Sequence, residues 1–205
     1  MRATSTIVQA LASGYERVLC CAEIEDAFAL KAELGDEAIT GGEREAQRIE
    51  GFDAGASPRE FREPRAGTLI LSTTNGTRTI VAAAESCGEV VLGSLLNLDA
   101  VVRHARERGE DAVLLCAGYK DAFAIDDAYC AGRIVALLEA GRTDAAIAST
   151  LIAERFPDPV DGINARTYGP PGLEEDIAWV AQVDLLNVVP RFARMVGAAA
   201  EVTLP

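Results

Sequence analysis

The sequence predicts an α/β fold with layered α/β/α architecture around a mostly parallel or mixed sheet. Three observations support this: an internal duplication, short apolar runs that alternate with helix-like segments, and polar or glycine-rich turns after those runs. Residues 4–27 and 77–100 align without a gap, with eleven identities in 24 positions, whereas chance gives roughly two. Strands that alternate with helices favour helices packed on both faces of one sheet.

Each copy of the duplication is expected to form a helix, a strand, a second helix and a second strand. The first helix of each copy opens at a Thr-x-Thr sequence, whose hydroxyls can cap backbone N–H groups, and continues with apolar residues at helical spacing. The predicted strands cover residues 17–21, 38–42, 89–92 and 113–118, and the predicted second helices lie near 24–34 and 98–108.

The second copy is preceded by a strand-like run at 67–72, whereas the first copy begins directly at its helix. The duplication therefore predicts that one N-terminal strand of the fold is missing before Arg2. We expect that this sequence begins after the strand; loss of the strand in evolution, or another strand in its place, are the alternative explanations. A missing strand would leave an exposed sheet edge that favours association, so a homo-oligomer is one expected outcome.

We expect one domain over residues 1–205, with the repeat copies at about 1–44 and 68–118 and a C-terminal part at 122–205 made of helices and loops. In the region that connects the two copies, only a short helix near 58–62 is expected. The C-terminal part is predicted to hold helices at 122–138, 143–155 and 173–183, a long surface loop at 156–172 and a strand at 185–189.

Composition limits the partners and the location of the protein. The net charge of −13 argues against nucleic acid, because the chain would repel a phosphate backbone. No apolar run reaches the roughly 20 residues of a membrane span, and the first residues do not form a secretory signal, so we expect a cytoplasmic protein without a membrane. The five cysteines include no CxxC pair, which fits reduced thiols. Such an acidic protein needs local arginines or a metal ion to bind an anion.

Two turns are candidates for anion binding. In open α/β sheets, ligands bind beyond the carboxyl ends of strands, where the next helix presents backbone N–H groups. The first turn lies near the start of the chain, where the duplication relates Arg2 and Thr4 to residues of the second turn. Arginine suits bidentate anion contact. The alternative is an ordinary strand–turn–helix connection with a threonine cap, and for Arg2 a surface arginine. The candidate residues of the second turn are Thr74, Asn75, Gly76 and Thr77.

Acidic residues near two other predicted strand ends are candidates for metal binding. Glu43 and Arg44 follow two glycines at the end of the 38–42 strand, and Asp126 and Asp127 precede an apolar helix. Carboxylates are the ligands that Mg²⁺ prefers. The alternatives are an exposed Glu–Arg turn and acids that complement a helix dipole. The single histidine, His104, lies in a charged helix and is expected to face solvent, which argues against a histidine nucleophile.

Taken together, these motifs resemble the 2-phosphosulfolactate phosphatase family, and the ordered set covers nearly the whole chain. The resemblance implies an α/β fold with a cleft and a Mg²⁺-dependent hydrolase that converts 2-phospho-3-sulfolactate and water to 3-sulfolactate and phosphate. In methane-producing organisms that step leads to coenzyme M. The matching stretches, in chain order, are Arg2–Thr6, Gly41–Arg44, Gly51–Asp53, Ser57–Pro58, Thr73–Thr77, Gly93–Ser94, Asn97, Cys116–Gly118, Asp127, Cys130–Gly132 and Asp176–Ile177.

The chain departs from the family pattern at three places. The family continues upstream of Arg2 with a strand that ends in Asp-Val-Leu; here Met1 stands in the Leu place and the acid is absent. If that acid binds metal, the chain would be inactive. The family usually has Asn where Ala56 stands and Glu where Asp126 stands; the second change keeps the charge but shortens its reach.

The expected mechanism places Mg²⁺ on Asp127, with Asp126 and Glu43 as further ligands, directly or through water. These three carboxylates are therefore the predicted catalytic and metal-binding residues. Thr74–Thr77 would hold one anionic group, and Arg2 and Arg44 would bind another. Substitution of Arg44 by alanine is expected to weaken substrate binding.

Two alternative functions remain open. The first is a phosphatase for another small phospho-acid, and the second is a non-catalytic protein that binds a small carboxylate, sulfonate or phosphate. Metal dependence separates the second from an enzyme, because a binding protein should hold its anion equally well in the presence of a chelator.

Overall fold

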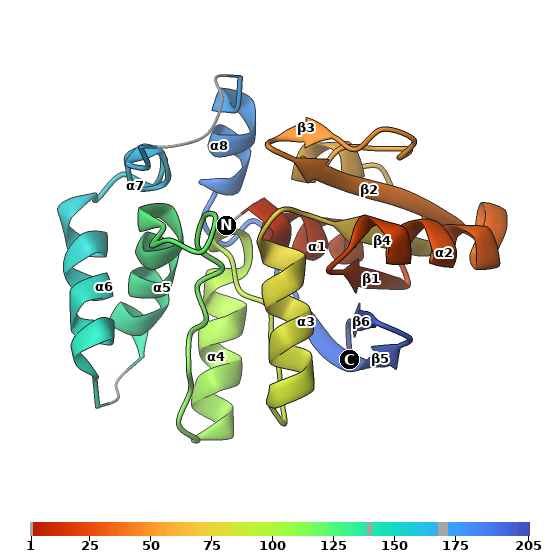
Figure 1. Ribbon diagram of the computed structural model, residues 1–205. Coiled ribbons are helices and arrows are strands. Elements are labelled where there is room, and N and C mark those ends of the chain that lie inside the picture. Colours follow the sequence, from red (N-terminus) through yellow and green to blue (C-terminus); the bar gives the residue numbers. More distant parts are fainter. Residues whose placement is uncertain (1, 139–140, 168–171) are drawn as a thin grey trace.

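The computed structural model describes residues 2–138, 141–167 and 172–205 (Figure 1). The helices are α1 (Arg2–Ala12), α2 (Ile24–Leu34), α3 (Gly76–Ser86), α4 (Leu98–Arg108), α5 (Ile125–Leu137), α6 (Asp144–Arg155), α7 (Pro159–Asn164) and α8 (Glu174–Val180), with 3-10 turns η1 (Gly35–Glu37), η2 (Pro58–Phe61) and η3 (Leu95–Asn97). The strands are β1 (Arg17–Cys21), β2 (Ala38–Arg44), β3 (Gln47–Arg48), β4 (Thr68–Ser72), β5 (Arg191–Val196) and β6 (Ala199–Thr203). Strands and helices alternate through the first half of the chain, so the predicted α/β class is confirmed.

The strands form one mixed sheet in the order β3-β2-β4-β1-β6-β5. The three central strands β2, β4 and β1 are parallel, whereas β3, β6 and β5 pair antiparallel. Gly42 lies opposite Ser72 in the β2–β4 register, so these two parallel strands end side by side at one edge of the sheet. This edge is where a ligand is expected in an open α/β sheet.

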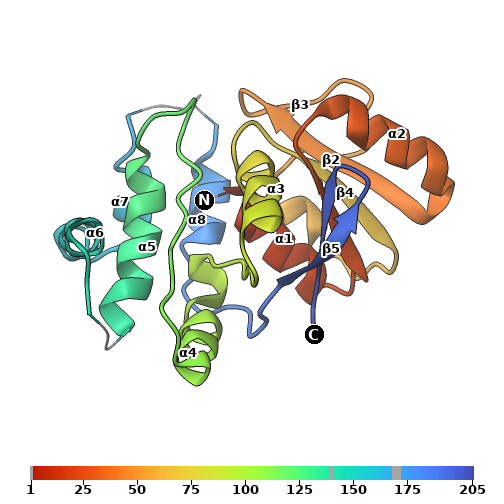
Figure 2. The same ribbon diagram turned by 60° about the horizontal axis from the view of Figure 1, so that its bottom comes forward.

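Helices cover both faces of the sheet, which confirms the predicted layering (Figures 1 and 2). Apolar residues of α1 and α3, including Ile7 and Ile80, pack on one face, and α2 packs on the other. The adjacent residues Cys20 and Cys21 point into these two different clusters, as the alternation of side chains along a strand requires.

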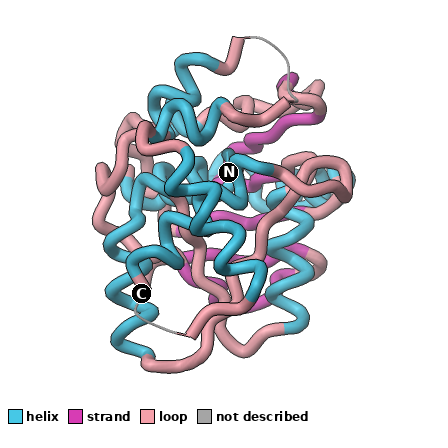
Figure 3. Tube along the Cα trace, turned by 90° about the vertical axis from the view of Figure 1, so that its left-hand side faces the viewer, coloured by secondary structure: helices cyan, strands magenta, loops and turns pink. Residues whose placement is uncertain are grey.

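A separate group of helices, α5 to α8, forms the C-terminal part with its own apolar cluster. Tyr129 of α5, Ile163 of α7 and Val180 of α8 are buried in this cluster together with Leu95 of η3. Figure 3 views the molecule from this side and shows the helices in front of the strands. The long loop expected at 156–172 is therefore wrong in part, because α7 lies within it, while residues 168–171 lie outside the described residues. No helix among the described residues has the length and apolar character needed to cross a membrane.

The duplication is visible in the helices but not in the strands. The first two helices of the first copy, α1 and α2, correspond to α3 and α4. The strands expected at 89–92 and 113–118 were wrong: in the first run only Val91 forms a bridge, to Arg191, and the second forms no strand. Val113 and Leu115 are exposed by 84% and 58%, so this run lies at the surface, and no described strand pairs with it. The prediction of a strand at 185–189 is also wrong, because these residues form no strand and the strands β5 and β6 follow them in the chain.

Helices α1 and α3 approach each other closely at the ends that face the same edge of the sheet. A Cβ atom added at Gly76, the first residue of α3, would lie 2.4 Å from Cβ of Ala3 in α1. Glycine at position 76 is therefore required for this packing. The N-terminal ends of both helices consequently open beside the carboxyl ends of β2 and β4.

Candidate active site

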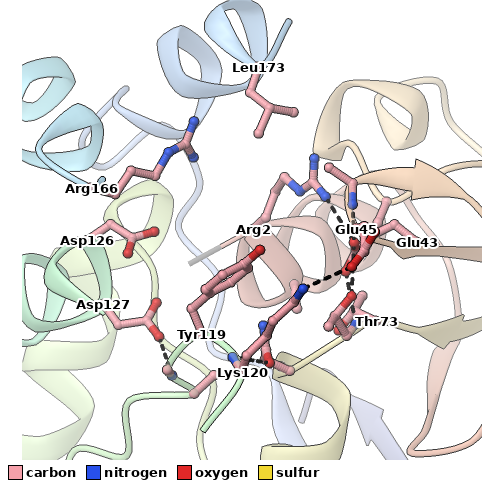
Figure 4. A pocket seen from close by; sticks show the side chains of 18 of the residues that line it. Arg2, Glu43, Glu45, Thr73, Tyr119, Lys120, Asp126, Asp127, Arg166 and Leu173 are labelled. Atoms are coloured by element: carbon pink, nitrogen blue, oxygen red, sulfur yellow. Dashed lines mark hydrogen bonds and ion pairs between the residues drawn. The ribbon is translucent and has the colours of Figure 1, made fainter. Parts of the chain in front are cut away.

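A cavity of about 430 Å³ lies at this edge of the sheet, between the sheet and the C-terminal helices (Figure 4). The cavity is lined by N-terminal residues of α1, α3 and α5 and by the turn that joins β2 to β3. Of the predicted site residues, seven line the cavity: Arg2, Glu43, Thr74, Asn75, Gly76, Asp126 and Asp127. Three do not: Thr4, Arg44 and Thr77.

The turn before α3 is held by two threonines that bond to each other's backbone. Thr73 Oγ1 accepts from the backbone N–H of Thr77 at 3.1 Å, and Thr77 Oγ1 accepts from the N–H of Thr73 at 2.9 Å. Thr77 is fully buried, so its part is to fix the turn rather than to face the cavity. Between these two residues, Thr74, Asn75 and Gly76 line the cavity at the positive end of the α3 dipole.

Glu43 joins two loops on one side of the cavity. Its carboxylate accepts from the backbone N–H of Ala46 at 2.7 Å and from the N–H and hydroxyl of Thr74 at 2.9 and 3.1 Å. Arg2 forms an ion pair with the same carboxylate at 3.6 Å. These contacts tie the β2–β3 turn to the β4–α3 turn and leave little of the Glu43 carboxylate for a metal.

Asp126 and Asp127 lie on the opposite side of the cavity, in the first turn of α5 (Figure 4). Both are buried, with 5% and 8% exposure, although their carboxylates face the cavity. Asp127 Oδ2 accepts from the backbone N–H of Gly118 at 2.9 Å, which orients the carboxylate. A pair of buried acids at a cavity wall is an arrangement that typically serves metal binding or proton transfer.

The three predicted metal ligands are therefore not brought together. Glu43 lies across the cavity from the two aspartates, and the described residues include no group of three or more His, Cys, Asp or Glu side chains that could hold a metal. Mg²⁺ needs less than such a group, because it commonly binds one or two carboxylates plus water and substrate phosphate. The two aspartates fit this pattern, so magnesium binding stays a prediction for Asp126 and Asp127.

Arg2 lines the cavity, whereas Arg44 is turned away from it. The Arg2 guanidinium lies 3.6 Å from Glu43 and 3.7 Å from Asp176, so two carboxylates hold it in place. Arg44 donates to Ser72 Oγ at 3.0 Å and to the backbone oxygen of Glu43 at 2.9 Å. A direct contact between Arg44 and the substrate stays a prediction that this placement does not favour.

We expect Arg44→Ala to change the KM for substrate by less than about twofold and to lower the free energy of unfolding by about 1 kcal/mol. The reason is that the fully buried Ser72 hydroxyl loses its donor, while no residue at the cavity changes. Substrate kinetics and urea unfolding of the purified variant measure the two effects. An increase of tenfold or more in KM would show that the Arg44 side chain reaches the substrate after all.

Sequence reasoning missed four residues of the cavity that carry charge or a hydroxyl. Lys120 and Glu45 line the cavity and form an ion pair with 2.9 Å between Nζ and Oε1, and Tyr119 and Arg166 also line it. Glu45 and Lys120 lie in turns with positive φ, which no periodic pattern indicates. Arg166 lies two residues after the end of α7, a helix in a segment that was expected to be a loop. Only the basic character of Lys120 and Arg166 in an acidic chain could have indicated them.

Other nucleophiles are disfavoured near this cavity. Cys130 lies one helical turn after Asp127, and burial raises the pKa of its thiol to about 12, so it stays protonated at neutral pH. His104 does not line the cavity. Its ring is half-buried and lies 3.1 Å from Glu89, which corrects the expectation that it faces solvent.

Fold and site together define an α/β protein with a polar cavity in which two buried aspartates face a helix N-terminus suited to an anion. A sequence profile of the 2-phosphosulpholactate phosphatase family matches residues 1–194. The chain belongs to this family.

Three bacterial relatives show how far the similarity extends, and each carries the name "Probable 2-phosphosulfolactate phosphatase". The protein of Clostridium acetobutylicum is 35% identical over 94% of this chain and 86% of its own length. That of Caldanaerobacter subterraneus subsp. tengcongensis is 36% identical over 93% of this chain and 84% of its own. That of Thermotoga maritima is 36% identical over 93% of this chain and 85% of its own.

Proposed function

We propose that this protein is a magnesium-dependent phosphatase that hydrolyses 2-phospho-3-sulfolactate to 3-sulfolactate and phosphate. Membership in the family supports the reaction. The structural observation that carries the proposal is the cavity that places Asp126 and Asp127 opposite the N-terminal turn of α3. An anionic phosphoryl group between the two would contact helix N–H groups on one side and face the two carboxylates on the other.

The net negative charge of the cavity lining supports the proposal that a metal ion binds there. Its described lining holds four carboxylates (Glu43, Glu45, Asp126 and Asp127) and three cations (Arg2, Lys120 and Arg166). A substrate with a phosphate, a carboxylate and a sulfonate would be repelled by a lining with an excess of negative charge. Bound Mg²⁺ would reverse this excess, neutralise charge on the phosphoryl oxygens and lower the pKa of a bound water.

The residues of the chain have separate parts in the proposed reaction. A water molecule attacks phosphorus and loses a proton, the bond between phosphorus and the C2 oxygen breaks, and the leaving alkoxide takes up a proton to give 3-sulfolactate. Asp126 and Asp127 would hold Mg²⁺, which would supply charge neutralisation, and their carboxylates would orient the attacking water. The backbone N–H groups of Asn75 and Gly76 bind the phosphoryl oxygens, whose charge is redistributed in the transition state, while the N–H and hydroxyl of Thr74 stay bonded to Glu43.

The test is phosphate release from 2-phospho-3-sulfolactate by the purified protein, freed of metal by chelation and then supplied with increasing Mg²⁺. We expect release to rise from background to saturation as Mg²⁺ is added, with Ca²⁺ as a poor substitute because it prefers more ligands and longer bonds. Release that is unaffected by chelation would contradict the magnesium part of the proposal. No release at any Mg²⁺ concentration would contradict the reaction itself.

The non-catalytic alternative predicts a different result in the same experiment. A binding protein would hold 3-sulfolactate or phosphate equally with and without chelator and would release no phosphate. A phosphatase for another phospho-acid would show metal-dependent release from that acid only. A cytoplasmic location, association into a homo-oligomer, the absence of a nucleic-acid partner, one domain over 1–205 and a place on the route to coenzyme M stay predictions.

A further inference from the structure

Three cationic side chains line the cavity among the described residues, and Arg166 is the one that forms no ion pair with a carboxylate. Arg2 is paired with Glu43 and Asp176, and Lys120 is paired with Glu45. Among the described residues, no carboxylate lies within ion-pair distance of Arg166, although it is partly buried. Figure 4 shows its side chain entering the cavity from the side of Asp126, with the guanidinium turned toward the open space.

The position of Arg166 places this charge away from the anion site at α3. Arg166 follows α7, in the C-terminal helical part, whereas Thr74–Gly76 belong to the sheet-containing part. In Figure 4, Asp126 and Arg166 lie on one side of the cavity, and Arg2 and Glu43 lie on the other. A ligand that spans the cavity would therefore meet the helix N-terminus with one end and Arg166 with another.

The three acidic groups of the proposed substrate differ in what they bind best. Phosphate and carboxylate oxygens are good ligands for Mg²⁺, and phosphate also suits helix N–H groups. A sulfonate is permanently ionised and weakly basic, so it competes poorly for a hard, strongly hydrated metal ion. It is well matched by a guanidinium, which is always charged, weakly hydrated and presents several donors in one plane.

We propose that Arg166 binds the sulfonate of the substrate and sets the preference of this site for phospho-acids with a second strong-acid group. This assignment rests on the proposed phosphatase function and deepens it. Arg166 is a specificity residue, which contacts a part of the substrate that takes no part in bond breaking. Its contribution therefore depends on the sulfonate and not on the phosphoryl group.

The experiment compares Arg166→Gln with the unchanged protein on 2-phospho-3-sulfolactate and on 2-phospholactate, which lacks the sulfonate. We expect the variant to raise the KM for 2-phospho-3-sulfolactate about 10- to 100-fold, the range for loss of a hydrogen-bonded charge pair. The kinetic constants for 2-phospholactate should change by less than about twofold. Arg166→Lys should restore part of the lost affinity, because it keeps the charge without the planar fork.

Arg155→Gln is the matched control, because Arg155 is an exposed arginine of the same helical part and does not line the cavity. Calorimetric binding of 3-sulfolactate and of lactate to each protein adds a measurement that does not require turnover. Equal losses of Arg166→Gln on both phosphate esters, or unchanged binding of 3-sulfolactate, would overturn the assignment. The proposed function fails separately, if the unchanged protein releases phosphate from neither ester.

Discussion

Asp127→Asn is expected to reduce magnesium-dependent phosphate release by about 10³-fold or more. The change removes one negative charge and keeps the size of the side chain, so the hydrogen bond from Gly118 at 2.9 Å can still be accepted. A metal at this position contributes several kcal/mol of transition-state stabilisation, and each 1.4 kcal/mol corresponds to about a tenfold change in rate. Steady-state phosphate release over a range of Mg²⁺ concentrations measures the effect.

The control is Asp121→Asn, which makes the same chemical change in the loop before α5. Asp121 is exposed and does not line the cavity, so its substitution should leave both the rate and the Mg²⁺ concentration at half-saturation within about twofold. If Asp127→Asn needs far more Mg²⁺ but reaches the original rate, the carboxylate binds metal without a further part in the reaction. Full activity at the original Mg²⁺ concentration would remove Asp127 from the site.

The contrast between Asp127 and Glu43 shows what sequence could and could not predict here. Both residues were expected as metal ligands, because both are acids near predicted strand ends. Both carboxylates have protein partners: Oδ2 of Asp127 accepts from Gly118, and the oxygens of Glu43 bind Ala46, Thr74 and Arg2 on the other side of the cavity. Ala46 is a close neighbour of Glu43, but Arg2 and Thr74 are distant along the chain, so no local pattern reveals these two contacts.

The first half of the fold was predictable because each element carries its own signal. The buried strands β1 and β4 hold short apolar runs, and the first helices have apolar residues at helical spacing. The segment at 113–118 has the same apolar character as a strand, yet it is extended without a ladder because a strand also needs a neighbour. The helix α7 was missed because it is short, contains a glycine and begins at Pro159, so composition favoured a loop.

Arg166 and Arg44 show a related limit for the site. Arg44 is the last residue of the family stretch Gly41–Arg44 and was predicted to bind substrate; in the structure its guanidinium donates to Ser72 at the end of β4. Arg166 stands after a helix that the sequence did not reveal, far from every predicted strand. The direction of a long side chain depends on packing between elements, which spacing along the chain does not determine.

Gly132→Ala is expected to destabilise the protein, although alanine is the better helix former. Gly132 lies in the middle of α5, where replacement by alanine would normally stabilise an exposed helix by about 1 kcal/mol. A Cβ atom here would lie 1.9 Å from the backbone oxygen of Ser149 and 3.0 Å from Cβ of Ala153, both in α6. A backbone oxygen cannot rotate away like a side chain, so α5 and α6 would have to separate. We expect a net loss of about 2–3 kcal/mol in the free energy of unfolding, the usual cost of overpacking a core.

The melting temperature of Gly132→Ala should therefore fall by about 5–10 °C, measured by calorimetry or circular dichroism. Gly88→Ala is the control, because no atom lies within 4 Å of the added Cβ and the change should stay within about 0.5 kcal/mol. Since Asp126 and Asp127 stand on the first turn of α5, separation of the helices would also move the two carboxylates that face the cavity. Phosphate release by the folded variant should then fall more than that of Gly88→Ala at the same temperature. A Gly132→Ala protein as stable as the original would show that α5 and α6 do not pack at this distance, and the position of the two aspartates would have to be revised with them.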